Sequence, residues 1–191
     1  VSLSSVSLWV RDIKLNKKQL RNLYLNKKTG NLRGSIIAAQ NKIKKRELIT
    51  QELRKEGFSE IGTLNDRERF LVGVSIYAGE GGKTDRDISF VNSDSKLIDF
   101  MMHWFKDFCN VPLDKFRGSL YIHDNLNELK AKKFWSKLTK IPLNQFTKSY
   151  IAKNNTKRLR NQKHENGIFR IKVSNANLHR KIMGWVDGIF K

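Results

Sequence analysis

The stretch that decides the fold is FLVGVSIYAGEGGK, residues 70–83, an apolar run that contains four glycines and one acid. Asn65, three residues before Glu68, forms a capping-box pattern, so we predict that a helix begins there. Glycine inside a helix costs about 1 kcal/mol relative to alanine, and Gly73 therefore indicates that another backbone comes close. Glu80 stands at the end of this helix, where negative charge opposes the helix dipole. A carboxylate held at such a place is a candidate metal ligand.

The run resembles the signature helix of the LAGLIDADG homing endonucleases. Residues 70–73 (FLVG) match the opening of that motif and residues 79–81 (GEG) match its acidic close, although the interval between Gly73 and Glu80 is longer than in the commonest form. In that family two such helices pack side by side across a domain or subunit interface, and each places its terminal acid at a DNA strand, where it holds a divalent metal. The other interpretation of the run is a buried core helix with a glycine cap.

This resemblance implies both a site and an interface. Glu80 would be the catalytic residue and the ligand of Mg2+, and Asp85 or Asp87 would replace it if the helix ended early. The dimer interface would consist of Phe70, Gly73, Val74, Tyr77 and Ala78. Because the chain has one signature helix, two active carboxylates require a homodimer.

The charge of the chain favours a polyanionic partner, because the net charge is +20 at pH 7. Residues 1–60 hold 14 Lys and Arg against 5 acids, residues 61–129 hold 8 against 11, and residues 130–191 hold 16 against 2. Binding to phosphates with release of counterions explains two basic ends better than solubility does. A membrane surface ranks lower, because no segment joins basic charge to a strongly apolar helical face.

The compartment and the domain boundary follow from composition. A single cysteine, Cys109, excludes an intramolecular disulfide, and the first ten residues lack the features of a signal peptide, so we predict a cytoplasmic location. No run approaches the length of a membrane span. The composition shifts near residues 57–62, which predicts a basic helical segment over residues 1–60 and a core domain over residues 61–191.

The core domain alternates strand and helix patterns. Strands are predicted at 88–91, 118–123, 146–152 and 167–174. Helices are predicted after Ser93 or Asp94, from Asn125 to Ile141, and from about Asn175 to the end. The inner stripe of the middle helix is predicted to be Leu126, Leu129, Phe134, Leu138 and Ile141. We therefore expect an α+β domain, a four-stranded sheet with helices on one face.

The last two predicted strands alternate apolar and basic residues. In residues 167–174 (GIFRIKVS) Phe169, Ile171 and Val173 face one way, and Arg170 and Lys172 face the other. A sheet with such a face can lie against a duplex and contact phosphates and base edges. The expected DNA contacts are Arg117, Tyr121, His123, Lys148, Tyr150, Lys153, Lys157, Arg158, Arg160, Arg170 and Lys172. The alternative is an ordinary solvated sheet face.

The N-terminus carries a further resemblance. Residues 1–13, VSLSSVSLWVRDI, are similar to the recognition helix of helix-turn-helix proteins, although the preceding helices of that motif are absent. Short Ser4 and Ser5 would permit close approach to a groove, and Arg11 would reach a phosphate. The alternative is an ordinary amphipathic helix.

The order of the elements also resembles the LAGLIDADG fold over residues 64–191, and the chain looks closest to a longer bacterial variant of it. The resemblance implies a Mg2+-dependent phosphodiesterase that cleaves a roughly palindromic DNA duplex as a homodimer. Two alternatives stay open, a non-cleaving DNA-binding transcription regulator on the same fold and an RNA-binding intron-splicing factor.

Overall fold

Residues 2–84, 86–153 and 165–191 are described by the computed structural model of the chain. They belong to two units, Val1–Thr63 and Leu64–Lys191. The boundary between them follows residue 63, whereas the composition of the sequence predicted a boundary after residue 60.

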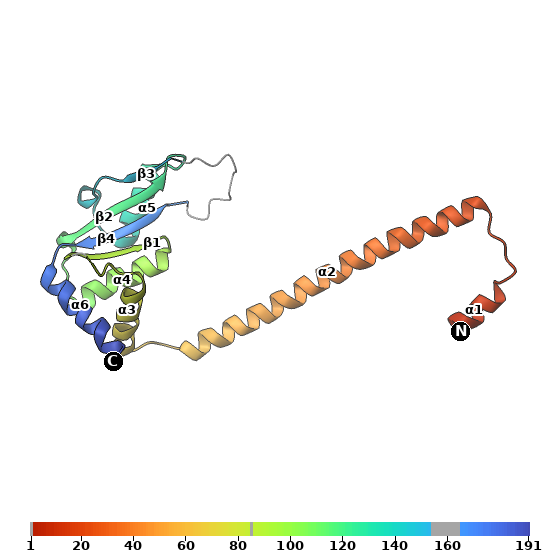
Figure 1. Ribbon diagram of the computed structural model, residues 1–191, viewed down its shortest axis with the longest axis horizontal. Helices are drawn as coiled ribbons and strands as arrows, with labels where there is room; N and C mark the ends of the chain where they lie inside the picture. The colour runs from red at the N-terminus through yellow and green to blue at the C-terminus, as the bar shows by residue number, and fades with distance from the viewer. Residues whose placement is uncertain (1, 85, 154–164) are drawn as a thin grey trace. The chain divides into compact units, whose positions relative to one another are not determined.

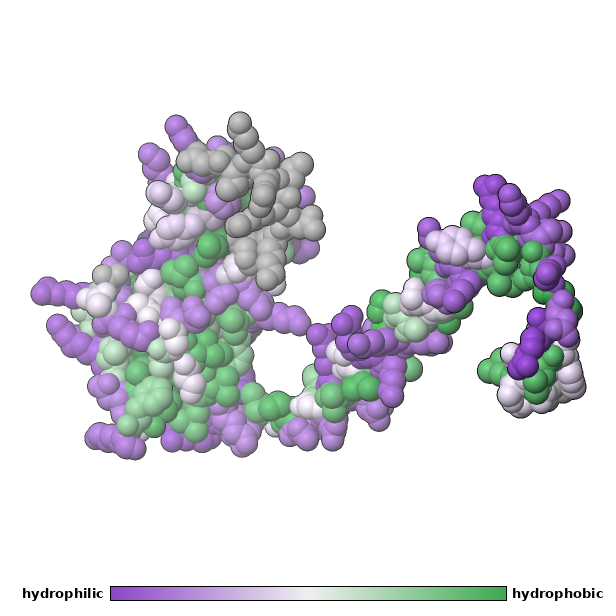
Figure 2. Space-filling view, turned by 45° about the vertical axis from the view of Figure 1, so that its right-hand side comes forward, coloured by the Kyte–Doolittle hydropathy of each residue, from purple (hydrophilic) through white to green (hydrophobic). Residues whose placement is uncertain are grey.

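The N-terminal unit consists of two helices, α1 (Leu3–Trp9) and α2 (Lys17–Ile61). A capping box between Asn16 and Gln19 starts α2, and Gly62 ends it with a positive φ of 59°. None of the described residues of either helix is buried, and apolar and polar side chains are interspersed along α2 (Figure 2). The helix predicted over residues 1–13 is shorter than expected, since α1 ends at Trp9. The described part of this unit therefore lacks a core of its own.

The C-terminal unit is an α+β domain, as predicted (Figure 1). Its elements are α3 (Asp66–Glu80), β1 (Ile88–Asn92), α4 (Ser95–Asp107), β2 (Phe116–His123), α5 (Glu128–Thr139), β3 (Tyr150–Ala152), β4 (Ile168–Val173) and α6 (Ala176–Ile189), with short 3-10 turns at Leu113–Lys115 and Leu143–Gln145. The four strands form one mixed sheet in the order β1-β4-β2-β3. β4 is antiparallel to both β1 and β2, and β3 is parallel to β2.

The sheet buries one face against helices. On β2 and β4 the buried side chains alternate with more exposed ones, which gives a covered face of Phe116, Leu120, Ile122, Phe169, Ile171 and Val173. Figure 1 shows α3, α4 and α6 on one side of the sheet. The Trp135 ring of α5 stacks on Phe169 at 5.0 Å between centroids, so α5 covers the same face. Every side chain of the buried apolar cluster lies between Val74 and Val186.

Two elements differ from their predicted limits. β3 contains three residues in place of the predicted 146–152, because Leu143–Gln145 forms a 3-10 turn and Phe146 makes only an isolated bridge to Gly118. α5 begins after the N-cap Asn127 and ends at Thr139, followed by Lys140 in the left-handed conformation with a φ of 62°.

The predicted inner stripe of α5 is confirmed only in part. Ile141 is fully buried and Leu126 and Leu138 pack against the core, but Leu129 is 57% and Phe134 36% exposed. The buried residues of the helix itself are Ala131, Trp135 and Thr139. Trp135 fixes this phase, because its ring stacks on Phe169 and its Nε1–H donates to the Asn166 carbonyl at 2.7 Å. Phe134 and Trp135 are neighbouring aromatics, so the pattern alone did not distinguish which one turns inward.

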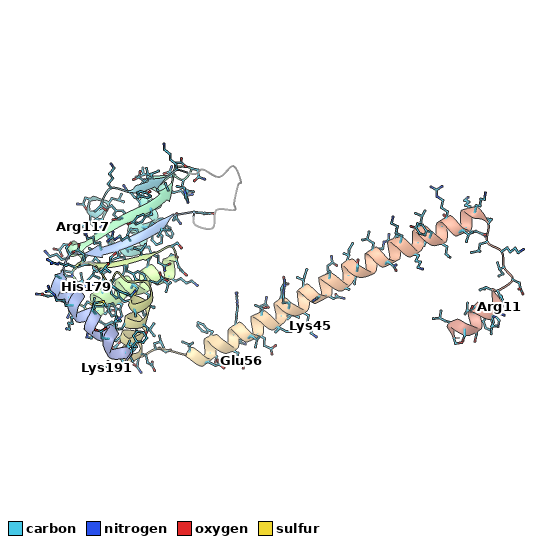
Figure 3. All side chains as sticks on the ribbon, in the orientation of Figure 1. Arg11, Lys45, Glu56, Arg117, His179 and Lys191 are labelled. Atoms are coloured by element: carbon cyan, nitrogen blue, oxygen red, sulfur yellow. The ribbon has the colours of Figure 1, made fainter. Side chains whose placement is uncertain are left out.

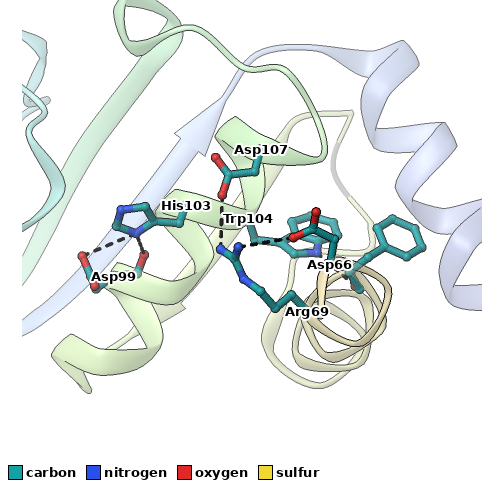
Figure 4. Close-up of polar contacts among 7 residues, drawn as sticks. Asp66, Arg69, Asp99, His103, Trp104 and Asp107 are labelled. Atoms are coloured by element: carbon teal, nitrogen blue, oxygen red, sulfur yellow. Dashed lines mark hydrogen bonds and ion pairs between the residues drawn. The ribbon is translucent and has the colours of Figure 1, made fainter. Parts of the chain in front are cut away.

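α3 begins with the predicted capping box of Asn65 and Glu68 and packs on α4 (Figure 4). The Trp104 indole lies against Gly73, where an added Cβ would be 2.0 Å from Trp104 Cδ1. Trp104 Nε1 donates to the Phe70 carbonyl at 3.0 Å, and Arg69 pairs with Asp107 at 3.2 Å between the two helices.

This packing corrects the predicted dimer interface. The small residue at position 73 makes room for a tryptophan of the same chain rather than for a second helix of a partner. Val74 and Tyr77 are fully buried in the chain's own core. Phe70 and Ala78 are half-buried and pack against that core. Gly73, Val74 and Tyr77 are therefore covered within the chain, and only Phe70 and Ala78 keep partly exposed surface.

Candidate nucleic-acid interface

The face of the sheet opposite the helices carries six of the fourteen predicted DNA contacts. We call it the open face. It consists of Ser89 and Val91 of β1, Ile168, Arg170 and Lys172 of β4, Arg117, Ser119, Tyr121 and His123 of β2, and Tyr150 and Ala152 of β3. Side chains alternate between the two faces of a strand, so the strand register decides which of these residues are neighbours.

The register arranges the open face in rows that cross the sheet. One row is Ser89, Lys172 and Arg117, and the next is Val91, Arg170 and Ser119. We call these two the cationic rows. The following row, the aromatic row, is Ile168, Tyr121 and Tyr150. Residues from segments far apart in the sequence thus form one continuous surface.

Arg170 lies in the middle of this surface, between Val91 of β1 and Ser119 of β2. Its Nε donates to the Ser89 hydroxyl at 2.8 Å, and its NH1 reaches the Tyr121 hydroxyl at 3.5 Å. The guanidinium is half-buried and spans from a cationic row to the aromatic row. Arginine has five N–H donors in a fixed plane, so these two contacts orient the guanidinium on the open face.

Lys172 differs from the expectation of a free cation. Its Nζ lies 2.7 Å from a carboxylate oxygen of Asp87. The hydrogen bond from Lys172, with smaller contributions from Ser174 and Arg170, holds the pKa of Asp87 below its usual value. A phosphate that binds at Lys172 must therefore compete with this carboxylate. Asp87, which the resemblance implied as an alternative metal ligand, is thus paired with Lys172.

Arg117 lies at the start of β2 (Figure 3). Its NH1 donates to the carbonyls of Asp114 and Phe116 at 2.7 and 2.8 Å, and its side chain is exposed. These bonds fix the guanidinium at the edge of the open face. Its remaining N–H groups can donate charge-assisted hydrogen bonds to an anion.

The remaining predicted contacts lie at the end of the open face or outside it. His123 ends β2 and pairs with Ala152, and exposed Lys153 follows directly. Lys148 is exposed but precedes β3, so it is not a strand residue as expected. Lys157, Arg158 and Arg160, like Asp85, lie outside the described residues. Ser4, Ser5 and Arg11 belong to the other unit, where the Ser2 hydroxyl caps α1 by accepting from the backbone N–H of Ser5 at 3.2 Å.

The glycine-rich turn after Glu80 is fixed by backbone contacts. Gly81 bridges to Phe90, and the Gly82 N–H donates to the Ser89 carbonyl at 2.7 Å. The Gly82 carbonyl accepts from the Tyr77 hydroxyl at 2.9 Å and lies 3.1 Å from His179 Nε2. These contacts attach the end of α3 to β1 beside the open face.

Glu80 itself is exposed at the end of α3. Lys83 Nζ donates to the carbonyls of Gly79 and Gly81 at 3.3 and 3.1 Å, which supplies positive charge where the helix dipole is negative. In residues 2–84, 86–153 and 165–191, no three His, Cys, Asp or Glu side chains come together as a potential metal site.

Three hydroxyl residues of the surface were missed from the sequence. Ser89 and Ser119 lie on the open face, and Thr147 joins it through its hydroxyl, 2.6 Å from that of Ser119. Alternation with Ile88 and Phe90 places Ser89 on the open face, where it is 5% exposed and its hydroxyl accepts a hydrogen bond from Arg170. Its contact with Arg170 depends on strand register across residues 89 and 170, for which the sequence carries no signal.

Comparisons of the chain with protein-family models, with curated proteins and with solved structures found no match. Among the helices of the described residues, none has both the length and the apolar character needed to cross a bilayer.

Proposed function

We propose that the chain is a DNA-binding protein that contacts the phosphate backbone with the open face of its sheet. The observation that carries this proposal is the placement of Arg117, Arg170 and Lys172 in two adjacent rows of one face. Phosphate contacts position a protein on nucleic acid and are made mainly by arginine and lysine. The excess of 38 Lys and Arg over 18 acids in the chain supports a polyanionic partner.

A salt titration tests this proposal. Affinity for a 20-base-pair duplex, measured by fluorescence anisotropy, should fall by about 40-fold between 50 and 200 mM salt if three phosphates are neutralised. Arg117→Ala should lower the slope of log Kd against log salt by about one. Lys106→Ala removes a cation from α4, on the helical side of the sheet, and should leave the slope nearly unchanged. Affinity that does not change with salt would refute the proposal.

A second candidate function is metal-dependent cleavage, in line with the LAGLIDADG resemblance, and the exposure of Glu80 favours it. Mg2+ is usually bound by one or two carboxylates together with waters and substrate phosphates. Glu80 would be one such carboxylate, and a second copy of the chain would add another. The exposed side of α3, formed by Leu71, Val72, Ser75 and Gly79, is available to such a copy in place of the buried residues predicted first.

Cleavage is tested separately from binding. The unmutated protein and Glu80→Gln are incubated with bound DNA and Mg2+ or Mn2+, and nicks are counted on a denaturing gel. If Glu80 holds the metal, Glu80→Gln should abolish nicking and leave DNA affinity within about twofold, because the open face is intact. Absence of nicking by the unmutated protein would leave DNA binding as the function.

A further inference from the structure

The aromatic row exposes apolar rings on a face that is otherwise polar. Tyr150 is 64% exposed and Ile168 is 39% exposed. The rings of Tyr121 and Tyr150 are 5.9 Å apart between centroids and tilted by 48°. Tyr121 is half-buried and held by the 3.5 Å contact from Arg170, whereas the Tyr150 ring belongs to a three-residue edge strand. Both rings thus stand on the rigid sheet with Tyr150 accessible.

The aromatic row lies one step along the strands from the cationic rows. Arg170 and Ile168 are two residues apart on β4, and Ser119 and Tyr121 are two residues apart on β2. Two residues of an extended strand span roughly 7 Å. This span is of the same order as the separation of base and phosphate within one nucleotide. A phosphate bound at Arg170 would therefore place the base of the same nucleotide near Tyr121 and Tyr150.

Base pairing decides which DNA can use such a row. In an intact duplex the faces of the bases are stacked on one another and cannot be reached by a protein ring. An unpaired base exposes its π face, and stacking on aromatic side chains is a general means of binding single strands. Rings on an open sheet beside cations are typical of that mode of recognition.

We propose that the aromatic row is a stacking site for an unpaired base, so that DNA containing a single-stranded segment is the preferred ligand of the open face. This inference rests on the proposed DNA binding and adds the class of DNA to it. Tyr150 stacks on the base, Arg170 positions Tyr121 beside it and contacts the adjoining phosphate, and Ile168 flanks the base. Because every base has a π face, the site discriminates little between bases.

The experiment compares three fluorescein-labelled probes, a blunt 20-base-pair duplex, the same duplex with a single-stranded tail of six thymidines, and a single strand of twelve thymidines. The unmutated protein should bind the tailed duplex more tightly than the blunt one. Tyr150→Ala should weaken binding of the single strand by about 5- to 150-fold, the effect typical of one lost base stack, and binding of the blunt duplex by less than twofold. Tyr150→Phe retains the ring and should stay within twofold on all probes.

Tyr24→Ala is the matched control. Tyr24 is 65% exposed, nearly the same as Tyr150, but lies on α2 in the other unit. Its substitution should leave the preference for the tailed duplex unchanged. Thermal unfolding of each variant verifies the fold.

The outcomes separate this inference from the proposed function. Salt-dependent binding of the blunt duplex, with Tyr150→Ala equal to the unmutated protein on single strands, would overturn the stacking site and leave DNA binding in place. An equal loss on blunt and single-stranded probes would overturn it too. Failure of the unmutated protein to bind any probe would refute both proposals.

Discussion

Asp87 and Lys172 oppose each other on a face whose other charged side chains are cationic. The carboxylate lies 2.7 Å from the Lys172 ammonium, and Arg170 adds to the positive potential around it. Both side chains are about one-third exposed, so water screens the pair and its contribution to folding is small. The pair therefore restrains Lys172 more than it stabilises the domain.

Removal of this acid should affect binding and stability in opposite directions. Asp87→Asn frees Lys172 for a phosphate, so duplex affinity should rise by up to about fivefold, corresponding to the roughly 1 kcal/mol limit for an exposed pair. The free energy of unfolding at pH 7 should fall by less than about 1 kcal/mol. Anisotropy titration and urea unfolding measure the two quantities, and weaker duplex binding would show that Asp87 contributes to recognition.

The sign of the pH dependence follows from the same pair. The pKa of Asp87 is lower in the folded chain than its ordinary value of 3.8. Its contribution to stability is therefore present above that value and is lost as the pH falls through the lower folded pKa. The difference in stability between the unmutated protein and Asp87→Asn should be constant from pH 5 to pH 7 and should disappear in stronger acid.

At the scale of elements, helix ends were more predictable than strand partners. Asn65 and Asn175 cap α3 and α6 as expected, and Asp94, one of the two candidates, caps α4, because capping depends on residues three positions apart at most. α5 is capped by Asn127 in place of the expected Asn125. Strand register and the phase of α5 depend on contacts between distant segments, such as Trp135 with Phe169. The composition of the open face could thus be predicted from alternation, but its rows and the Lys172–Asp87 pair could not.

The contact of α3 with α4 gives a prediction at this scale. Gly73→Ala would place a Cβ 2.0 Å from the Trp104 indole, so the indole must move and its bond to the Phe70 carbonyl must weaken. Overpacking of this kind typically costs about 1–3 kcal/mol. Urea unfolding followed by tryptophan fluorescence measures the loss.

Gly79→Ala is the matched control in the same helix. A Cβ at Gly79 meets nothing within 4 Å, and alanine favours a helix over glycine by about 1 kcal/mol. This variant should be as stable as the unmutated protein or more stable. If Gly73→Ala were neutral in stability but altered the oligomeric state in sedimentation, the packing of Gly73 within its own chain would be the wrong explanation.

At the scale of the whole molecule, the two units contribute differently. All residues of the buried apolar cluster belong to Leu64–Lys191, and the described residues of α1 and α2 bury none. α2 instead concentrates charge, with ten Lys and Arg and no acid over residues 17–46, followed by four Glu and two basic residues over 47–61. Stability is therefore expected to reside in one unit, while both units carry positive charge.

Removal of the N-terminal unit tests this division. A fragment of residues 64–191 retains 24 Lys and Arg against 13 acids and the complete open face. Its thermal unfolding should stay cooperative, with a Tm within about 3 °C of the full chain, since 1 kcal/mol shifts the Tm of a domain of this size by roughly that amount. Duplex binding should persist and remain sensitive to Arg117→Ala, but with a shallower dependence on salt, because the positive charge of α2 is gone. A fragment that unfolds far below the full chain, or that loses duplex binding altogether, would place part of the core or of the DNA-binding surface in residues 1–63.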